Sequence, residues 1–508
     1  MQSVYGRNGI NCSSPLVRSE IEREEPMIAE NSLKTILVVV PHEDDEINLA
    51  GSTIYRFVQE GKKVICVFVT NGDWLFSVDV RMKEALNSLQ ALGMPSENAI
   101  FLGYPDGGVH GERSLFMHGK QNVMDAAGHT HTYGSSFKKD FATEEYGHPQ
   151  SYTWTSLVQD LENVILKYKP DMIIGTDFDN HPDHRMCSIA LDTAMGNILN
   201  RDSNSYFPIY LKGFAYSIAF EGKDDFFSFT NIKPSLINEK ALTYPELGTD
   251  NPAFEWEKRI CIPALDACRT FDLHKNVIYK ALCSYISQRI FVRAGRIING
   301  DQVYWKKRTD NLVHQGEITV SSGEKKYLSD FQTLYTEDIS VPKPVFENYG
   351  WKPEDRDTEK WCRCTFKKPR HIESVSFWGN IEETSRLTAG ELVFSNGYHC
   401  SVQSLREKGR ETIIPIEPQE NIQWIEFRMT QFYGNPVIAE WGIYETKDIP
   451  LIFEEEKENL KTTLQQKVKS GIMRNWAWWQ VHWMRMKMEP KHHALKKEAK
   501  RANFAKSK

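Results

Sequence analysis

Between residues 34 and 310, short apolar runs alternate with longer stretches in which apolar residues recur at helical spacing. The apolar runs have the length and β-branched content of buried strands, and the clearest are TILVVV (35–40), KKVICVFV (62–69) and DMIIG (171–175). The longer stretches end at a glycine, as helices commonly do, in INLAGSTIYRFVQEG (47–61) and RMKEALNSLQALG (81–93). This alternation predicts a Rossmann-like α/β fold, with a mostly parallel sheet and helices on both faces.

From residue 316 to residue 446 the pattern changes to short apolar runs separated by turn residues. Helical periodicity is weak there, and the spacing of the runs predicts an all-β sandwich. The last segment has the pattern of a basic helix. The predicted domains are therefore an α/β domain over 34–310, a β-sandwich over 316–446 and a basic amphipathic helical tail over 455–508.

The helical tail carries a stripe of large apolar residues followed by basic ones. The apolar residues are spaced by 4, 3, 4 and 3 positions, which places them on one face of a helix, and they are Ile472, Trp476, Trp479, Trp483 and Met486. Residues 485–508 hold nine basic residues against two glutamates, a net charge of +7, which leaves −13 for the rest of a chain whose total is −6. Such a helix suits an anionic membrane surface, so we expect residues 470–508 to contact that surface or, as the alternative, a partner subunit or the sandwich.

The composition also indicates where the protein resides and which partners it binds. The nine cysteines form no framework of pairs, no apolar run is long enough to span a membrane, and the first residues lack the apolar core of a signal peptide. These features predict a cytoplasmic protein, peripheral on the inner face of the membrane if the tail binds lipid. No dinucleotide-binding G-x-G-x-x-G follows the first strand, and no nucleic-acid-binding module is recognised, so we expect no nucleic-acid partner.

Two of the predicted strands end in loops crowded with histidine and carboxylate. The first loop is PHEDDE (41–46) and the second is HPDH (181–184). Adjacent carboxylates raise one another's pKa, so such a cluster either lies in solvent or binds a cation. Because parallel strands end at one edge of a sheet, the two loops together can supply the imidazoles and carboxylates of a catalytic zinc site. For HPDH alone, the alternative is a helix cap with exposed histidines.

At these residues the chain resembles the PIG-L/LmbE-type metal-dependent de-N-acetylases. That family carries P-H-P-D-D-E after its first strand and H-x-D-H further on. TNGD (70–73), the R-x-x-E pattern of the helix at 81–93, FLGYPDGG (101–108) and a late helix at 280–288 extend the resemblance over residues 34–310. One departure is Glu43, which stands where the family commonly has proline.

The resemblance implies a site for Zn²⁺ or another divalent metal ion, with the ligands His42, Asp45 and His184. It implies Asp44 as the general base that takes a proton from a metal-bound water. His181 would stabilise or protonate the tetrahedral intermediate, and Asp183 would hold His181 in the correct tautomer. Together these residues would hydrolyse an acetamide to acetate and a free amine.

The resemblance also implies contacts with substrate. Arg81 and Asp106 are candidates for binding sugar hydroxyls, and Glu43 could add a carboxylate. Their alternatives are an ion pair on a helix for Arg81 and a turn residue for Asp106. We expect the substrate to be an N-acetylglucosamine-type sugar of a glycoconjugate; the alternatives are a same-family amidase acting on a thiol conjugate or another amide, and a non-catalytic glycan-binding protein.

The region 316–446 resembles a discoidin-like (galactose-binding-like) sandwich. Its signs include ITVSSGEKKYLSD (318–330) and IAEWGIYE (438–445). Such a domain either binds a glycan through its loops or supports the catalytic domain. We expect Trp361, Trp378 and Trp424 to lie in the core of the sandwich rather than to act as platforms for sugars. We expect His129, His131 and His148, in a long insertion, to be surface or substrate-wall residues rather than metal ligands.

Overall fold

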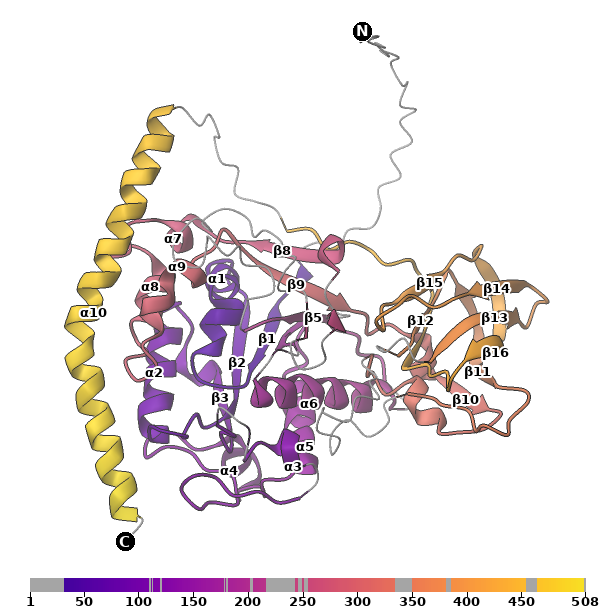
Figure 1. Ribbon diagram of the computed structural model, residues 1–508, viewed down its shortest axis with the longest axis horizontal. Helices are drawn as coiled ribbons and strands as arrows, with labels where there is room; N and C mark the ends of the chain where they lie inside the picture. The colour runs from indigo at the N-terminus through magenta and orange to yellow at the C-terminus, as the bar shows by residue number, and fades with distance from the viewer. Residues whose placement is uncertain are drawn as a thin grey trace, which may run out of the picture.

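The computed structural model of the chain describes residues 32–108, 111, 113–118, 121–177, 179, 181–201, 204–215, 243–244, 249–250, 255–333, 350–380, 385–453 and 464–506. An α/β part lies between a β-sandwich and a long C-terminal helix, which runs along the side away from the sandwich (Figure 1). Residues 455–463, where the helical tail is predicted to begin, lie outside the described residues.

The α/β part is built on a seven-stranded sheet with the order β3-β2-β1-β4-β5-β9-β8. Its strands are β1 (Thr35–Val40), β2 (Lys63–Thr70), β3 (Ala99–Tyr104), β4 (Met172–Thr176), β5 (Ile209–Gly213), β8 (Arg259–Pro263) and β9 (Asp301–Lys307). Strands β1 to β5 run parallel, whereas β9 pairs antiparallel with β5 and with β8. A short separate ribbon pairs β6 (Thr243–Tyr244) with β7 (Thr249–Asp250).

Helices cover both faces of this sheet. They are α1 (Asp45–Gln59), α2 (Val78–Ala91), α3 (Leu115–His118), α4 (Phe141–Tyr146), α5 (Trp154–Tyr168), α6 (Pro182–Leu199), α7 (Asp266–Arg269), α8 (Val277–Leu282) and α9 (Ala294–Ile297). Alternate residues of β1 enter opposite cores: Ile36 and Val38 pack with α1, α2 and α8, whereas Leu37 and Val39 pack with α5 and α6. The predicted fold class, a mostly parallel sheet with helices on both faces, is confirmed.

The late helix differs from its prediction over 280–288. The structure has α8 end at Leu282, and the chain continues in turns to Gln288. These turns direct Tyr285 toward Glu46 and Ser287 toward Glu84, with which both side chains form hydrogen bonds. The segment that follows α8 therefore makes polar contacts with both α1 and α2.

The sandwich consists of two antiparallel sheets, β10-β11-β16-β13-β14 and β15-β12-β17. Its strands are β10 (Gly316–Val320), β11 (Trp361–Ile372), β12 (Ser374–Trp378), β13 (Arg386–Phe394), β14 (His399–Gln403), β15 (Thr412–Ile414), β16 (Gln419–Tyr433) and β17 (Glu440–Tyr444). Its core holds two fully buried tryptophans, Trp351 and Trp441. The prediction that Trp361, Trp378 and Trp424 lie in the core is wrong, because all three are half-buried.

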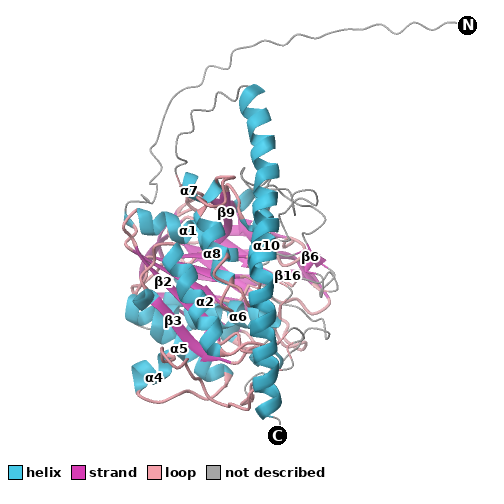
Figure 2. Cartoon of the chain, turned by 90° about the vertical axis from the view of Figure 1, so that its left-hand side faces the viewer, coloured by secondary structure: helices cyan, strands magenta, loops and turns pink. Residues whose placement is uncertain are grey.

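The C-terminal helix is α10 (Leu464–Lys506), which crosses the front of the molecule in Figure 2. It packs on the same side of the sheet as α2 and α8, and its Ala477 and Val481 belong to the core shared with β1 and α1. Within the described part of the chain, no helix combines the length and the apolar content that crossing a membrane requires.

Candidate active site

The two histidine-rich loops meet because β1 and β4 are neighbouring parallel strands. Val39 of β1 pairs with Gly175 of β4, so both strands end at the same edge of the sheet. The first loop turns directly into α1, which begins at Asp45. The second turns into α6, where His181 is the N-cap and Pro182 is the first helical residue. Both loops therefore end at helix N-termini, which hold their side chains in place.

The three predicted metal ligands approach one another closely. Asp45 Oδ2 lies 3.0 Å from His42 Nδ1 and 3.2 Å from His184 Nε2. A tetrahedral zinc with ligands at about 2.0–2.2 Å separates its ligand atoms by about 3.3–3.6 Å. These two separations are compatible with a shared divalent metal ion. Two groups around His42 have ligand atoms that all lie within 4.8 Å of one another, His42 with His181 and His184, and His42 with Asp106 and Asp183. The site can therefore hold a metal ion, and the specific ligand set His42, Asp45 and His184 stays a prediction.

Positive charge is favoured at this cluster. Burial alone would lower the pKa of His42, but the hydrogen bonds that its ring donates to the carboxylates of Asp183 and Asp45 hold this pKa well above its usual value. Burial alone would raise the pKa of Asp45, but His184 and His42 hold it well below its usual value. The protein therefore keeps Asp45 ionised in a buried place, as a carboxylate ligand of a metal must be.

Asp44 adopts a strained backbone conformation beside the ligands, with φ 128° and ψ −20°. Non-glycine residues rarely adopt positive φ, and such strain costs on the order of 1–3 kcal/mol and is common at functional sites. Its backbone N–H donates to Glu46 Oε2 (3.0 Å), and its Oδ1 lies 3.5 Å from Arg81 Nη2. Burial raises the pKa of its carboxyl to about 6, against the effect of Arg81.

The contacts of Asp183 differ from the predicted ones. Its carboxylate bonds to His42 Nε2 (3.1 Å) and accepts from the N–H of Gly107 (2.9 Å). Its backbone N–H, rather than its side chain, donates to His181 Nδ1 (3.2 Å). This bond leaves the proton of a neutral His181 on Nε2. Burial, together with His42 and His184, lowers the pKa of His181 to about 4, so the imidazole is neutral at pH 7.

The three predicted substrate contacts fall into two groups. Asp106 lies in the loop after β3, partly exposed, and accepts from the N–H of Gly108 (2.8 Å). Arg81 and Glu43 are only 3% and 0% exposed. Arg81 donates to the Glu43 carbonyl and thus supports the loop that holds Asp44. A direct contact of Arg81 or Glu43 with substrate stays a prediction.

Two carboxylates at the site were not singled out by the sequence. Asp179 bonds to His184 Nδ1 (2.6 Å) and so orients this ligand from behind, as carboxylates commonly do for metal-binding histidines. Glu46 accepts from Ser88 Oγ (2.8 Å) and from the Tyr285 hydroxyl. The only sequence signal for them is position: Glu46 is the last residue of PHEDDE, and Asp179 stands two residues before HPDH.

His129, His131 and His148 are all exposed, as expected for surface residues. The ligand atom of His129 lies within 4.8 Å of those of Asp73 and Asp125, so its place outside any metal site stays a prediction. His129 bonds to Asp125 (2.7 Å), and His131 to the hydroxyl of Thr130 (2.9 Å). None of the three contributes an atom to the cluster around Asp45.

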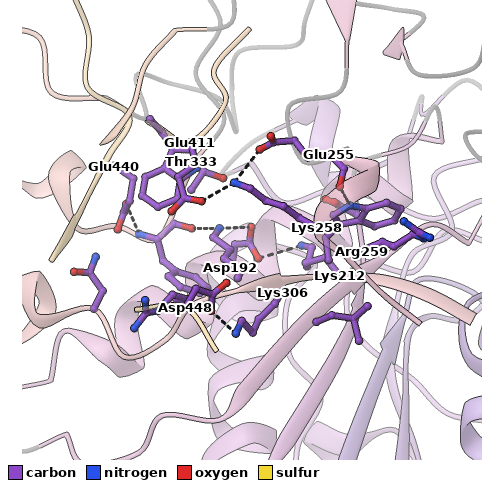
Figure 3. Close-up of a pocket in the computed structure, with 18 of the residues that line it drawn as sticks. Asp192, Lys212, Glu255, Lys258, Arg259, Lys306, Thr333, Glu411, Glu440 and Asp448 are labelled. Atoms are coloured by element: carbon purple, nitrogen blue, oxygen red, sulfur yellow. Dashed lines mark hydrogen bonds and ion pairs between the residues drawn. The ribbon is translucent and has the colours of Figure 1, made fainter. Parts of the chain in front are cut away.

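A cavity of about 400 Å³ lies elsewhere, between the sheet and the sandwich (Figure 3). Its wall carries charges of both signs, many of them paired, as in the bonds of Asp192 to Lys212 and Lys307 (both 3.0 Å). None of the three predicted metal ligands lines it. We therefore assign it to the junction between the two parts of the chain.

Tyr285 offers a test of how Asp44 is held. Replacing it with phenylalanine removes a hydrogen bond to the buried Glu46 and should lower kcat by about tenfold, as expected for the loss of roughly 1.5 kcal/mol. KM and metal content should stay unchanged. Tyr279→Phe, at a buried tyrosine of α8, is the matched control. Equal kcat values in the two variants would contradict a role for Tyr285 in positioning Asp44.

Two sequence families match the chain. Residues 37–195 match the family described as PIG-L: GlcNAc-PI de-N-acetylase, and residues 311–446 match DUF7402, a domain of unknown function. The predicted resemblance is thereby confirmed, and it supports a de-N-acetylase as the class of enzyme. No curated protein matches the sequence.

Solved structures with similar parts include enzymes and sugar-binding modules. The N,N'-diacetylchitobiose deacetylase from Pyrococcus horikoshii is 19% identical, with a TM-score of 0.25. The match covers 38% of this chain and 63% of the deacetylase, so the chain spans less than two thirds of that enzyme's length. The conserved protein TT1542 from Thermus thermophilus is 16% identical, with a TM-score of 0.29 over 54% and 94%. A Clostridium perfringens module in complex with GlcNAc-alpha-1,4-galactose is 11% identical, with a TM-score of 0.19 over 26% of this chain and 92% of that one.

Proposed function

We propose that this chain, with its PIG-L family domain at residues 37–195, is a metal-dependent de-N-acetylase that acts on an N-acetylglucosamine-type sugar of a glycoconjugate. One observation carries the proposal: Asp45 Oδ2 lies within 3.0 and 3.2 Å of the ring nitrogens of His42 and His184, next to a partly exposed acid and imidazole. That acid is Asp44 and that imidazole is His181.

His42, Asp45 and His184 would hold the metal ion. Two imidazoles and a carboxylate suit Zn²⁺ and several other divalent ions. When bound, such an ion supplies Lewis acidity and lowers the pKa of a coordinated water.

Asp44 would act as the general base. With a pKa of about 6 its carboxylate is ionised at pH 7 and near the optimum for proton transfer. It takes a proton from the water that adds to the acetamide carbonyl. When the C–N bond breaks, that proton goes to the leaving nitrogen, and the products are acetate and the free amino sugar.

His181 would stabilise the negative charge that develops on the acetamide oxygen. Its neutral ring, with the proton on Nε2, can donate one hydrogen bond there, a contribution typically worth about 3–4 kcal/mol in the transition state. Asp106 would accept a hydrogen bond from a sugar hydroxyl, since it is the other partly exposed carboxylate of the site. The sandwich would bind a more distant part of the glycan.

The test is a panel of amides given to the purified, zinc-loaded protein. The panel holds N-acetylglucosamine, its glycosides, N,N'-diacetylchitobiose and an N-acetylcysteine conjugate, and both acetate and free amine are measured. We expect acetate and amine in equal amounts from at least one N-acetylglucosamine compound. Release from the cysteine conjugate alone would replace the proposal with an amidase. No release from any compound by a metal-loaded protein would leave a glycan-binding role.

A further inference from the structure

One face of α10 is fixed on the α/β part by specific contacts. Ala477 and Val481 are buried in the core. Gln480 Nε2 donates to the Phe271 carbonyl (3.3 Å), and His492 Nδ1 bonds to the Ile286 carbonyl (3.1 Å). The side of the helix that faces away from the α/β part is therefore determined.

The outer face carries the large apolar residues. They are Ile472 (64% exposed), Trp476 (50%), Trp479 (67%), Trp483 (51%) and Met486 (58%). At 100° per residue this stripe is centred opposite Ala477 and Val481. Single exposed apolar residues are ordinary, but a continuous row of them, three of which are tryptophans, marks a surface that binds something apolar.

Basic residues continue the same helix beyond the stripe. The exposed ones are Lys487, Lys491, Lys496, Lys497, Lys500 and Arg501. Of the two glutamates in this part, Glu489 is engaged with Arg289 and Arg485, and Glu498 is exposed, so positive charge remains in excess. The Lys487 ammonium lies over the Trp483 ring, 5.3 Å from its centroid, so the two kinds of surface adjoin. A partner of this helix must therefore have an anionic surface and an apolar interior that the tryptophan side chains can enter.

The helix also passes the rim of the candidate active site. The ring of His492 lies 6.0 Å from that of Phe76, in the loop that follows β2. The same loop exposes Trp74 and Leu75. Arg113 belongs to the loop that follows β3, and its guanidinium lies over the ring of Trp74, 5.3 Å from the ring centroid. A surface bound to α10 thus lies near the loop that carries Asp106.

From these observations we propose that the outer face of α10 docks on an anionic lipid bilayer. Tryptophan and methionine side chains would enter the boundary between headgroups and acyl chains, and the basic residues would bind the lipid phosphates and carboxylates. The helix would lie in the plane of the membrane while its inner face stays on the α/β part (Figure 2). The proposal does not depend on the proposed function.

The experiment is co-sedimentation of the full chain with vesicles, because deleting α10 would expose the core around Ala477 and Val481. Vesicles of phosphatidylcholine alone are compared with vesicles that also contain phosphatidylserine. The test variant is Trp476→Ser/Trp479→Ser/Trp483→Ser, and the matched control is Phe432→Ser/Tyr433→Ser, two exposed aromatic residues of the sandwich. Thermal melting and light scattering without lipid establish that each variant is folded and give its oligomeric state.

We expect the wild type and the control to bind the phosphatidylserine vesicles, and the tryptophan variant to bind at least ~10-fold more weakly. Binding should fall with added salt, since the basic residues contribute through charge. Equal binding by the tryptophan variant, or no wild-type binding at low salt, would overturn the proposal. A lipid-independent dimer that the tryptophan variant converts to a monomer, without vesicle binding, would assign the face to a second copy of the chain.

Discussion

Replacing Asp44 with asparagine should reduce kcat by about 10²–10⁴-fold, the usual contribution of a positioned general base. Asparagine has the same shape, and it tolerates positive φ better than most residues, so the strained loop should keep its conformation. Because His42, Asp45 and His184 are untouched, metal content should equal that of the wild type. The measurement is kcat on the sugar that the panel identifies, together with metal content.

The control for this substitution is Asp79→Asn. Asp79 is an acid at the start of α2 that bonds to Ser136 (2.7 Å), outside the cluster around Asp45. This variant should retain wild-type activity. If Asp44→Asn also retained more than about a tenth of the wild-type kcat, Asp44 could not be the general base, and His181 would be the next residue to test.

Removing two of the three proposed ligands should abolish metal binding. We expect about one equivalent of zinc or another divalent ion in the wild type and a small fraction of that in His42→Ala/His184→Ala, because the remaining carboxylate cannot hold the ion alone. Elemental analysis of the purified proteins gives the answer without a substrate. Added zinc should also raise the melting temperature of the wild type, through preferential binding to the folded state, and leave that of the variant unchanged.

A second pair of histidines provides the control. His131→Ala/His148→Ala removes two exposed imidazoles from the same part of the chain, neither of which belongs to a possible metal-binding group among the described residues, and it should keep the full metal content. Wild-type protein that binds no metal even after zinc is added back would refute the metal site and favour a glycan-binding protein. Metal retained by the His42→Ala/His184→Ala variant would place the site elsewhere in the chain.

The sequence predicted much of the candidate site because its signals are local. A buried strand followed by PHEDDE, and another followed by HPDH, place each set of side chains at a strand end. Neighbouring parallel strands bring such ends together, and β1 and β4 are indeed neighbours. The fold class could be predicted from the same kind of signal, because the periodicity of apolar residues in strands and helices is visible over short stretches of sequence.

Contacts between distant segments could not be predicted in this way. The carboxylate of Asp183 bonds to His42, which lies 141 positions away, rather than to the neighbouring His181. Arg81 is buried and donates a hydrogen bond to the backbone carbonyl of Glu43, 38 positions away. Tyr285, in the turns after α8, bonds to Glu46, which lies 239 positions away. Each of these contacts depends on how helices pack on the sheet, which no local pattern encodes.

In the C-terminal helix, the sequence by itself determined which residues share a face, and the tertiary structure decided which face is buried. The spacing from Ile472 to Met486 determined that the large apolar residues share one face of a helix, and the lysines determined its charge. Only the packed structure decided which face turns inward. The small residues Ala477 and Val481 allow α10 to approach the α/β part closely and enter its core, so the tryptophans opposite them remain exposed.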